Sequence, residues 1–269
     1  MIKVATIAGS DASGGAGLEA DLKTFEEYGV YGMAAITLIA TMDSDNEWSH
    51  GVYPLDESVL RAQMNTIFKG IGVDAAKSGM LGTRYAVEMT AEYIHEYKIE
   101  RYVLDPVMVC KGANEALNPE LNELVADKLL PLSLVVTPNL FEAGQLAGIK
   151  TPSNIEEMKD AAKKIYDRGS HNVFIKGGSK LEGMTNALDL FYDGSRFNQV
   201  ESALIATKWT HGAGCTTAAA ITAGLALGLD PYEAVSRAKK FITLSLRGSF
   251  ALNRWVGPGN PSQWRKGFN

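Results

Sequence analysis

The chain has 269 residues, of which 46% are hydrophobic and 21% charged, and its mean hydropathy is -0.06. These values fit one domain over residues 1–269 and exclude a fibrous, disordered or membrane-embedded chain. The formal net charge is -5 and no basic tail is present, so we expect neither a nucleic-acid partner nor a membrane partner. No signal-peptide pattern precedes the two cysteines, Cys110 and Cys215, which predicts free thiols and a cytoplasmic location.

Short β-branched runs alternate with helical segments along the chain. We expect strands at residues 4–8, 35–40, 75–77, 102–104, 134–136 and 173–175. Helices are expected at residues 17–28, 56–68, 84–97, 120–129 and 155–168, and from residues 140, 216 and 231 onward. Residues 187–192 and 196–200 predict a hairpin around Asp193-Gly194, and residues 48–55 predict a small flap. This alternation predicts an α/β fold, a three-layer α/β/α sandwich with a mostly parallel central sheet.

Ligands bind at the carboxyl ends of the strands in such a sheet, so the residues that follow each strand are candidates for a site. The first candidate segment is glycine-rich and runs from Gly9 to Gly17. Glycines allow a ligand to approach the backbone closely, and Ser10 and Asp11 at the strand end are expected to contact a substrate. The segment is neither a dinucleotide fingerprint nor a Walker loop, and a turn without a ligand is the alternative.

Polar residues also follow three later strands. Asp105 ends a central strand, where a buried carboxylate needs a metal or a cation, although it could instead cap a local turn. Asn139 and Glu142 have the spacing of a capping box, a purely structural role, yet they too lie at the functional edge. Lys176, followed by Gly177, is placed like a phosphate-binding cation, with a surface lysine as the alternative.

The strongest candidate is the segment Thr210-His-Gly-Ala-Gly-Cys215, which leads into a helix. The backbone N–H groups of Gly212, Ala213 and Gly214 are expected to form an anion hole with that of Cys215. A thiol at a helix N-terminus is expected to have a lowered pKa. His211 could assist the chemistry or simply support the loop through hydrogen bonds.

Taken in this order, these motifs resemble the ribokinase-like superfamily, in its vitamin B6 kinase and hydroxymethylpyrimidine kinase branch. The resemblance runs from residues 7–17 through Lys77-Ser-Gly-Met-Leu81 and Asp105-Pro-Val-Met108 to Gly212-Ala-Gly-Cys215, and covers nearly the whole chain. It implies ATP as co-substrate, bound by Asn139, Lys176 and Gly177, and Mg²⁺ organised by Asp105 and Glu142. It also implies that Cys215 lies near the substrate hydroxyl, that Gly9, Met80 and Val107 lie where the substrate ring binds, and that the enzyme is a homodimer.

Two departures from the superfamily narrow the expected reaction. Most members carry Asp where this chain has Cys215. The mechanism in which that carboxylate acts as the base therefore does not apply to this chain. Hydroxymethylpyrimidine kinases tend to have Gln or Glu where this chain has Met42, which suits a pyridine ring better than an aminopyrimidine. The pattern of Cys110, His211 and Cys215 resembles the two-cysteine pyridoxal kinases of this branch.

We therefore expect ATP-dependent phosphorylation of the 5′-hydroxyl of pyridoxal, and also of pyridoxine and pyridoxamine. In this reaction Cys215 would act as a thiolate base, and Cys110, on a segment able to close over the site, would contact the substrate. Phosphorylation of hydroxymethylpyrimidine is the alternative. Two alternatives come from other classes of protein. A nicotinamide-dependent oxidoreductase is disfavoured because the dinucleotide fingerprint is missing, and a non-catalytic sensor is disfavoured because it would not need the predicted anion hole.

Overall fold

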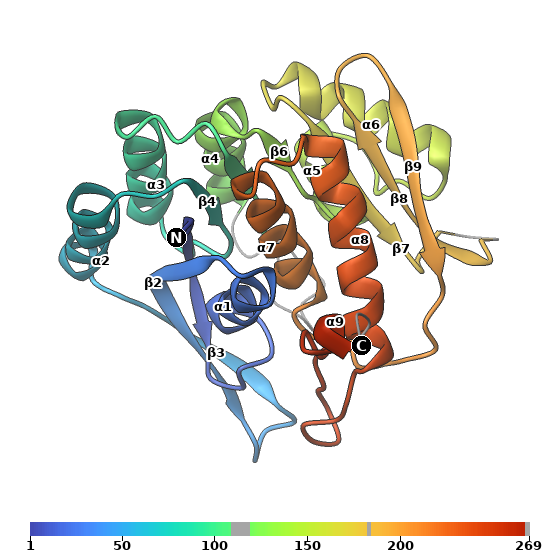
Figure 1. Ribbon diagram of the computed structural model, residues 1–269, viewed down its shortest axis with the longest axis horizontal. Coiled ribbons are helices and arrows are strands. Elements are labelled where there is room, and N and C mark those ends of the chain that lie inside the picture. Colours follow the sequence, from blue (N-terminus) through green and yellow to red (C-terminus); the bar gives the residue numbers. More distant parts are fainter. Residues whose placement is uncertain (109–118, 182–183, 267–269) are drawn as a thin grey trace.

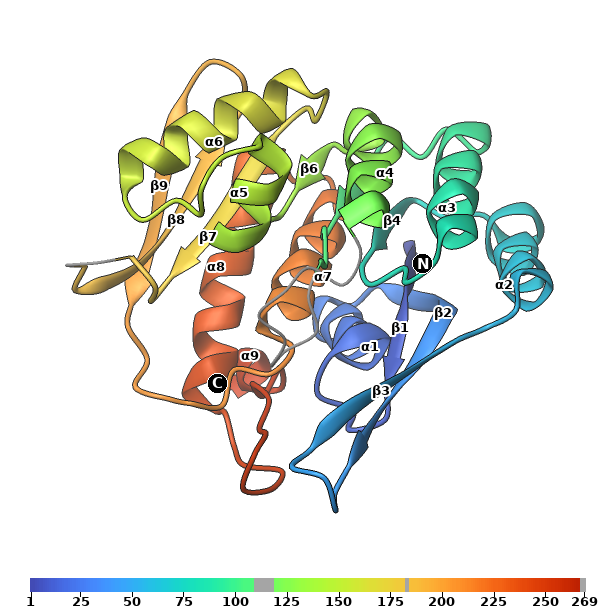
Figure 2. The ribbon, with the colours of Figure 1, turned by 180° about the vertical axis from the view of Figure 1, so that it is seen from behind.

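The structure is a computed structural model that describes residues 1–108, 119–181 and 184–266. Within these residues a nine-stranded sheet has the order β3-β2-β1-β4-β5-β6-β7-β8-β9. Neighbours from β2 to β7 pair in parallel, whereas β3, β8 and β9 are antiparallel to their neighbours. Helices cover both faces of the sheet (Figures 1 and 2), so the predicted α/β/α class is confirmed.

The expected strands are all present, several of them longer than predicted. The described strands are β1 (Lys3–Asp11), β2 (Tyr31–Asp43), β3 (Ser49–Pro54), β4 (Ala75–Ser78), β5 (Tyr102–Leu104), β6 (Val135–Val136), β7 (Val173–Gly178), β8 (Asn186–Tyr192) and β9 (Phe197–Ala203). Strand β2 extends well beyond the expected residues 35–40, because its second half pairs with β3. This antiparallel pair is the flap predicted for residues 48–55.

The helices follow the predicted order. They are α1 (Gly17–Tyr28), α2 (Glu57–Met64), the π-helix η1 (Asn65–Ile71), α3 (Arg84–Glu96), α4 (Pro119–Leu129), the 3₁₀ helix η2 (Leu130–Leu132), α5 (Leu140–Ala147), α6 (Ile155–Asp167), α7 (Ala213–Ala226), α8 (Pro231–Arg247) and α9 (Gln263–Lys266). The helix expected at residues 56–68 changes type after Met64. Helix α7 begins three residues before the expected Thr216, because Gly212 has a left-handed φ of 73° and already caps it. Gly214 and Cys215 therefore lie in the first helical turn and not in a loop.

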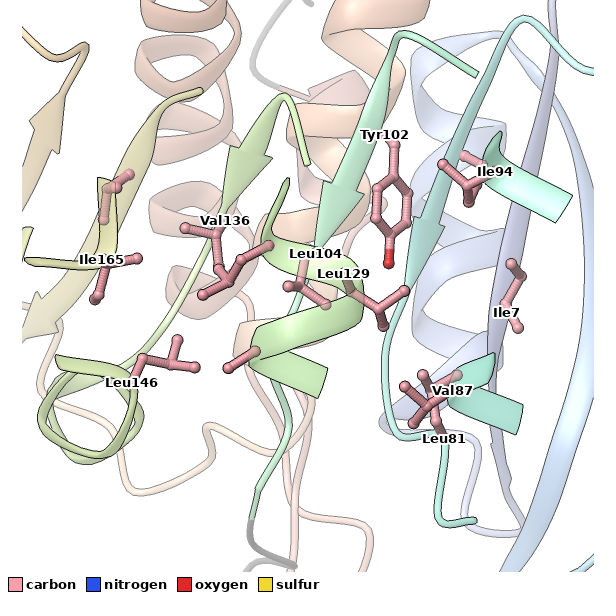
Figure 3. Packing of buried hydrophobic residues seen from close by; sticks show 14 of the residues in the cluster. Ile7, Leu81, Val87, Ile94, Tyr102, Leu104, Leu129, Val136, Leu146 and Ile165 are labelled. Atoms are coloured by element: carbon pink, nitrogen blue, oxygen red, sulfur yellow. The ribbon is translucent and has the colours of Figure 1, made fainter. Parts of the chain in front are cut away.

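Two apolar layers hold the helices on the sheet. Helices α3 to α6 cover one face, where Val87, Leu129, Leu146 and Ile165 pack toward the strands (Figure 3). Helices α1, α7 and α8 cover the other face, with Phe241 among the fully buried side chains. Burial of each such side chain stabilises the fold by about 1.5–3 kcal/mol. This packing holds the loops at the carboxyl ends of the strands on a rigid base. In the described part of the chain, no helix has the length and apolar character needed to cross a bilayer.

Candidate active site

A cavity of about 780 Å³ opens at the carboxyl ends of the parallel strands. It is bordered by the loop between β1 and α1, by the flap, and by the first turn of α7. Most predicted site residues line it: Gly9, Ser10, Met42, Met80, Asp105, Val107, Asn139, Glu142, Lys176, His211, Gly212, Ala213, Gly214 and Cys215. The fold thus brings together residues that lie more than 200 positions apart in the sequence.

Of the predicted residues that the structure describes, Gly177 is not among those that line the cavity. A Cβ on Gly177 would lie 2.5 Å from the carbonyl oxygen of Leu188, so this glycine faces the neighbouring strand. The next residue, Gly178, lines the cavity instead, because successive residues of a strand point to opposite sides. Cys110 and the segment expected to close over the site lie outside the described residues.

Asp105 and Lys176 form an ion pair at the centre of the cavity wall. Lys176 Nζ lies 2.9 Å from Asp105 Oδ1, and Thr137 Oγ1 donates to the same oxygen. Burial alone would lower the pKa of Lys176, but Asp105 and then Glu142 raise it above its ordinary value. Lys176 is therefore a charged group aimed into the cavity, and the surface-lysine alternative is wrong.

The capping box predicted at the start of α5 is present. Asn139 Oδ1 accepts the Glu142 N–H at 3.0 Å, and Glu142 Oε2 accepts the Asn139 N–H at 2.8 Å. Both residues also line the cavity, so the structural and the functional interpretations hold together. Burial raises the pKa of Glu142 to about 7, with Lys176 lowering it and Asp105 raising it further. A second buried carboxyl group thus lies beside the Asp105–Lys176 pair, in surroundings that disfavour its ionised form.

This carboxylate pair fits Mg²⁺ held jointly with phosphate oxygens. Among the described residues no cluster of three or more His, Cys, Asp or Glu side chains could hold a metal. Mg²⁺ commonly binds one or two carboxylates and completes its shell with water and substrate phosphates. Asp105 and Glu142 supply the hard oxygen ligands that such a site needs, and a bound cation would favour the ionised form of Glu142.

The first turn of α7 faces the cavity with its backbone. Gly212 is required there, since a Cβ would lie 1.9 Å from the Gly15 carbonyl oxygen. The Ala213 N–H donates to the Thr210 carbonyl at 3.2 Å, so it is not the free donor that we expected. Gly214 and Cys215 occupy the next positions, where backbone N–H groups have no acceptor within the helix. An anion hole at this turn would therefore depend mainly on these later donors.

The expected low pKa of Cys215 is wrong for the ligand-free protein. Burial raises the pKa of this thiol to about 12, and the charges of Asp21 and Asp105 act in the same direction. Lys77 and a hydrogen bond from the Gly17 N–H lower it, but do not offset the burial. The local effect of the helix N-terminus is outweighed by groups from other elements. Cys215 is a neutral thiol in this environment.

His211 forms a buried pair with Asp11. Its Nε2 lies 2.7 Å from Asp11 Oδ2, and both side chains are less than a tenth exposed. Burial would raise the pKa of Asp11, but hydrogen bonds from His211 and Ser13 lower it to about 2. The supporting role considered for His211 is therefore present in the structure.

Sequence reasoning missed two further buried pairs that line the cavity wall or support it. Lys77 Nζ lies 2.8 Å from Asp21 Oδ2, with both side chains fully buried. Lys239 Nζ lies 2.7 Å from Asp189 Oδ2 at the opposite end of the cavity. A signal existed for Lys77, because a lysine inside a short apolar strand requires a buried partner.

Known proteins with similar sequences share this architecture. The sequence matches the phosphomethylpyrimidine kinase family over residues 11–260. A putative pyridoxine kinase of Treponema pallidum is 55% identical over 100% of both chains. A hydroxymethylpyrimidine/phosphomethylpyrimidine kinase of Bacillus subtilis is 40% identical, over 97% of this chain and 94% of its own.

Solved structures agree with these relatives. The ADP complex of Bacillus subtilis pyridoxal kinase superposes with a TM-score of 0.95 at 51% identity, covering 98% of this chain and 99% of its own. Staphylococcus aureus pyridoxal kinase in complex with AMP-PCP and pyridoxal superposes with a TM-score of 0.93 at 46% identity, covering 99% of this chain and 95% of its own. The chain belongs to the phosphomethylpyrimidine kinase family.

Proposed function

We propose that the protein is an ATP-dependent kinase that phosphorylates the 5′-hydroxyl of pyridoxal, and also that of pyridoxine and pyridoxamine. The observation that carries this proposal is a cavity whose described lining combines charged and apolar side chains. We assign Lys176, Asn139 and the two carboxylates to a polar end, and Met42, Met80 and Val107 to an apolar end, with the first turn of α7 between them. The pyridoxine and pyridoxal kinases that are about half identical to this chain support this substrate class.

The apolar end is suited to a flat ring with few polar edges. Methionine side chains are polarisable and pack well on aromatic faces. Met42 offers no oxygen to the exocyclic amine of an aminopyrimidine, and a buried amine without a partner costs about 1–3 kcal/mol. The cavity therefore favours pyridoxal over hydroxymethylpyrimidine, which is the second candidate because a 40% identical relative acts in that branch.

The polar end is suited to the phosphates of ATP. Lys176 presents a fixed positive charge, and Asn139 lies beside it at the start of α5. Asp105 and Glu142 would hold Mg²⁺, which supplies positive charge to the transferred phosphoryl group when bound. These side chains position the phosphates through charge and hydrogen bonds, and need no covalent chemistry.

The α7 turn between the two ends would stabilise the transferred group. The N–H groups of Gly214 and Cys215 would receive the negative charge that develops on the phosphoryl oxygens. Because the transition state of phosphoryl transfer is loose, the substrate hydroxyl loses its proton late and can pass it to an oxygen of the transferred phosphoryl group. A neutral Cys215 thiol can therefore orient this hydroxyl by accepting a hydrogen bond, without first becoming a thiolate.

A coupled assay of ATP consumption with Mg²⁺ tests the proposal. It compares kcat/KM for pyridoxal and for hydroxymethylpyrimidine on one preparation of the protein. We expect a clear preference for pyridoxal. A preference for the pyrimidine would assign the protein to the second candidate function, and no turnover of either would refute both.

Two further expectations, one from the resemblance and one from the cysteines of the sequence, complete the proposal. We propose that the protein acts as a homodimer, which light scattering at working concentration would detect as twice the mass of the chain. We also propose a cytoplasmic location, which fractionation of cells that express the protein would check. A monomer with full activity, or a protein recovered outside the cytoplasm, would contradict these statements.

A further inference from the structure

Asp11 and His211 join two loops that are 200 positions apart in the sequence. Asp11 ends β1 and opens the glycine-rich loop before α1, whereas His211 lies in the loop before α7. The two side chains meet at 2.7 Å and are buried beside the cavity. A buried, charge-assisted hydrogen bond between distant segments restricts their relative movement more than an exposed pair would.

The loop before α1 holds the Asp11 carboxylate rigidly. Its Oδ1 accepts the N–H of Ser13, and its Oδ2 accepts the Ser13 hydroxyl and the N–H of Ala16, all within 2.9 Å. The Asp11 N–H itself donates to Glu19 Oε2 at 2.8 Å. The carboxylate therefore presents one fixed position to His211.

The loop before α7 holds His211 through its backbone and by close packing. The His211 N–H donates to the Gly257 carbonyl at 3.0 Å. A Cβ on Gly15 would lie 2.6 Å from His211 Cδ2, and a Cβ on Gly212 would lie 1.9 Å from the Gly15 oxygen. The ring and the backbone on either side of it thus lie directly on the loop before α1.

The Asp11–His211 pair also affects the position of Cys215. Gly17, the first residue of α1, and Cys215, in the first turn of α7, line the same cavity, and the Gly17 N–H is close enough to lower the pKa of the thiol. These two residues belong to the two helices whose loops Asp11 and His211 join. Separation of the loops would move the thiol relative to the phosphate end of the cavity.

We propose that Asp11 and His211 form a positioning pair, which fixes the first turns of α1 and α7 relative to each other and so sets the geometry of phosphoryl transfer at Cys215. This inference rests on the proposed kinase function. It replaces the expected substrate contact of His211 with an indirect role. The pair would act on kcat more than on binding, because both ends of the cavity keep their own lining residues when the pair is broken.

The test compares His211→Ala, His211→Gln, Asp11→Asn and the double variant H211A/D11N. A displacement of about 1 Å can cost about 10²-fold in rate, so we expect His211→Ala to lower kcat by about that factor. The KM for pyridoxal and the Kd for ADP should stay within about threefold, a change smaller than one lost hydrogen bond produces. His211→Gln keeps a donor toward Asp11 and should recover most of the rate. The double variant should be no slower than the slower single variant, because both break one interaction.

Asp230→Ala is the matched control for stability. Asp230 caps α8 and its N–H and carboxylate interactions are exposed to solvent. Loss of this cap should lower Tm by about 2–4 °C and leave kcat unchanged. If the rates of all variants, including Asp230→Ala, fell in proportion to Tm, the positioning role would be refuted.

Alkylation of Cys215 by iodoacetamide supplies a readout that does not depend on turnover. In a Cys110→Ser background Cys215 is the remaining cysteine of the sequence. We expect His211→Ala to speed its alkylation by about tenfold, since local opening exposes a protected group. Unchanged alkylation with unchanged kcat, or a raised KM for pyridoxal with unchanged kcat, would overturn the proposal. If the wild-type protein failed to phosphorylate pyridoxal, the proposed function would fail, while the alkylation rates would still test the pair.

Discussion

The buried pair of Lys77 and Asp21 permits a prediction whose size follows from the structure. Lys77→Met removes the ammonium group and keeps most of the apolar stem. Asp21 then keeps its hydrogen bond from Thr6 Oγ1 at 2.6 Å, while Asp21 Oδ1 has no hydrogen-bond partner. The substitution therefore leaves an uncompensated carboxylate in a fully buried position.

Breaking a buried ion pair by removing one partner typically costs about 3–5 kcal/mol. We expect Lys77→Met to lower the free energy of unfolding at pH 7 by about this amount. The double variant K77M/D21N removes both charges and should recover to within about 1 kcal/mol of the wild type, because a neutral pair carries no such penalty. Lys69→Met, at an exposed lysine, should change the stability by less than about 0.5 kcal/mol.

The pH dependence of the free energy of unfolding distinguishes the effect of an unpaired charge from the effect of lost packing. Burial raises the pKa of Asp21, although Lys77 and Thr6 lower it, so removal of Lys77 should raise it further. The folded state then binds more protons than the unfolded state above pH ~4, and the stability of K77M falls as the pH rises toward the folded pKa. The free energy of unfolding of K77M should therefore lie further below that of K77M/D21N at pH 7 than at pH 5.

Urea unfolding of the four proteins at both pH values measures these differences. A loss below about 1 kcal/mol for K77M, equal at both pH values, would refute the reasoning, since it would show a well-solvated carboxylate. A large loss shared by K77M/D21N would also refute it, because the cost would then come from packing alone.

Three further predictions concern the reaction. Cys215→Ala removes the acceptor that orients the hydroxyl and should lower kcat by about tenfold, while the Kd for ADP, measured by calorimetry, stays unchanged; an unchanged kcat would show that the thiol is not needed. Met42→Gln supplies an acceptor for an exocyclic amine and should raise kcat/KM for hydroxymethylpyrimidine by about tenfold. If the ratio of kcat/KM for hydroxymethylpyrimidine to kcat/KM for pyridoxal did not change, Met42 would not be the residue that discriminates between the two substrates. Lys239→Met leaves Asp189 buried and without its ion-pair partner, and should weaken ADP binding by about tenfold. Lys240→Met, at the exposed neighbouring residue, should leave ADP binding unchanged. If the two variants bound ADP equally well, the Lys239–Asp189 pair would have no role in nucleotide binding.

Features that depend on neighbours in the sequence were predictable. Helix α1 has the predicted limits, because Gly29 adopts the left-handed conformation that ends it. The capping box of Asn139 and Glu142 and the cap at Asp230 follow from side chains that reach only three residues along the chain. The order of strands and helices predicted a parallel sheet, and with it the edge where the cavity lies.

Features that depend on distant residues were not predictable from local patterns. The pairs Lys77–Asp21 and His211–Asp11 join positions 56 and 200 residues apart, and only the order of the strands brings them together. The error at Cys215 has the same origin. A helix N-terminus acts on a thiol through its own first turn, whereas the desolvation and the charges of Asp21 and Asp105 arise from other elements.

The sequence by itself thus determined the fold class and placed most of the predicted site residues in one cavity, because periodicity, capping and strand ends are local properties of the chain. Only the tertiary structure decided which of those residues are charged, neutral or already paired. The physical reason is that burial and electrostatic interactions depend on distance in space, and the folded sheet sets those distances between segments that are far apart in the chain.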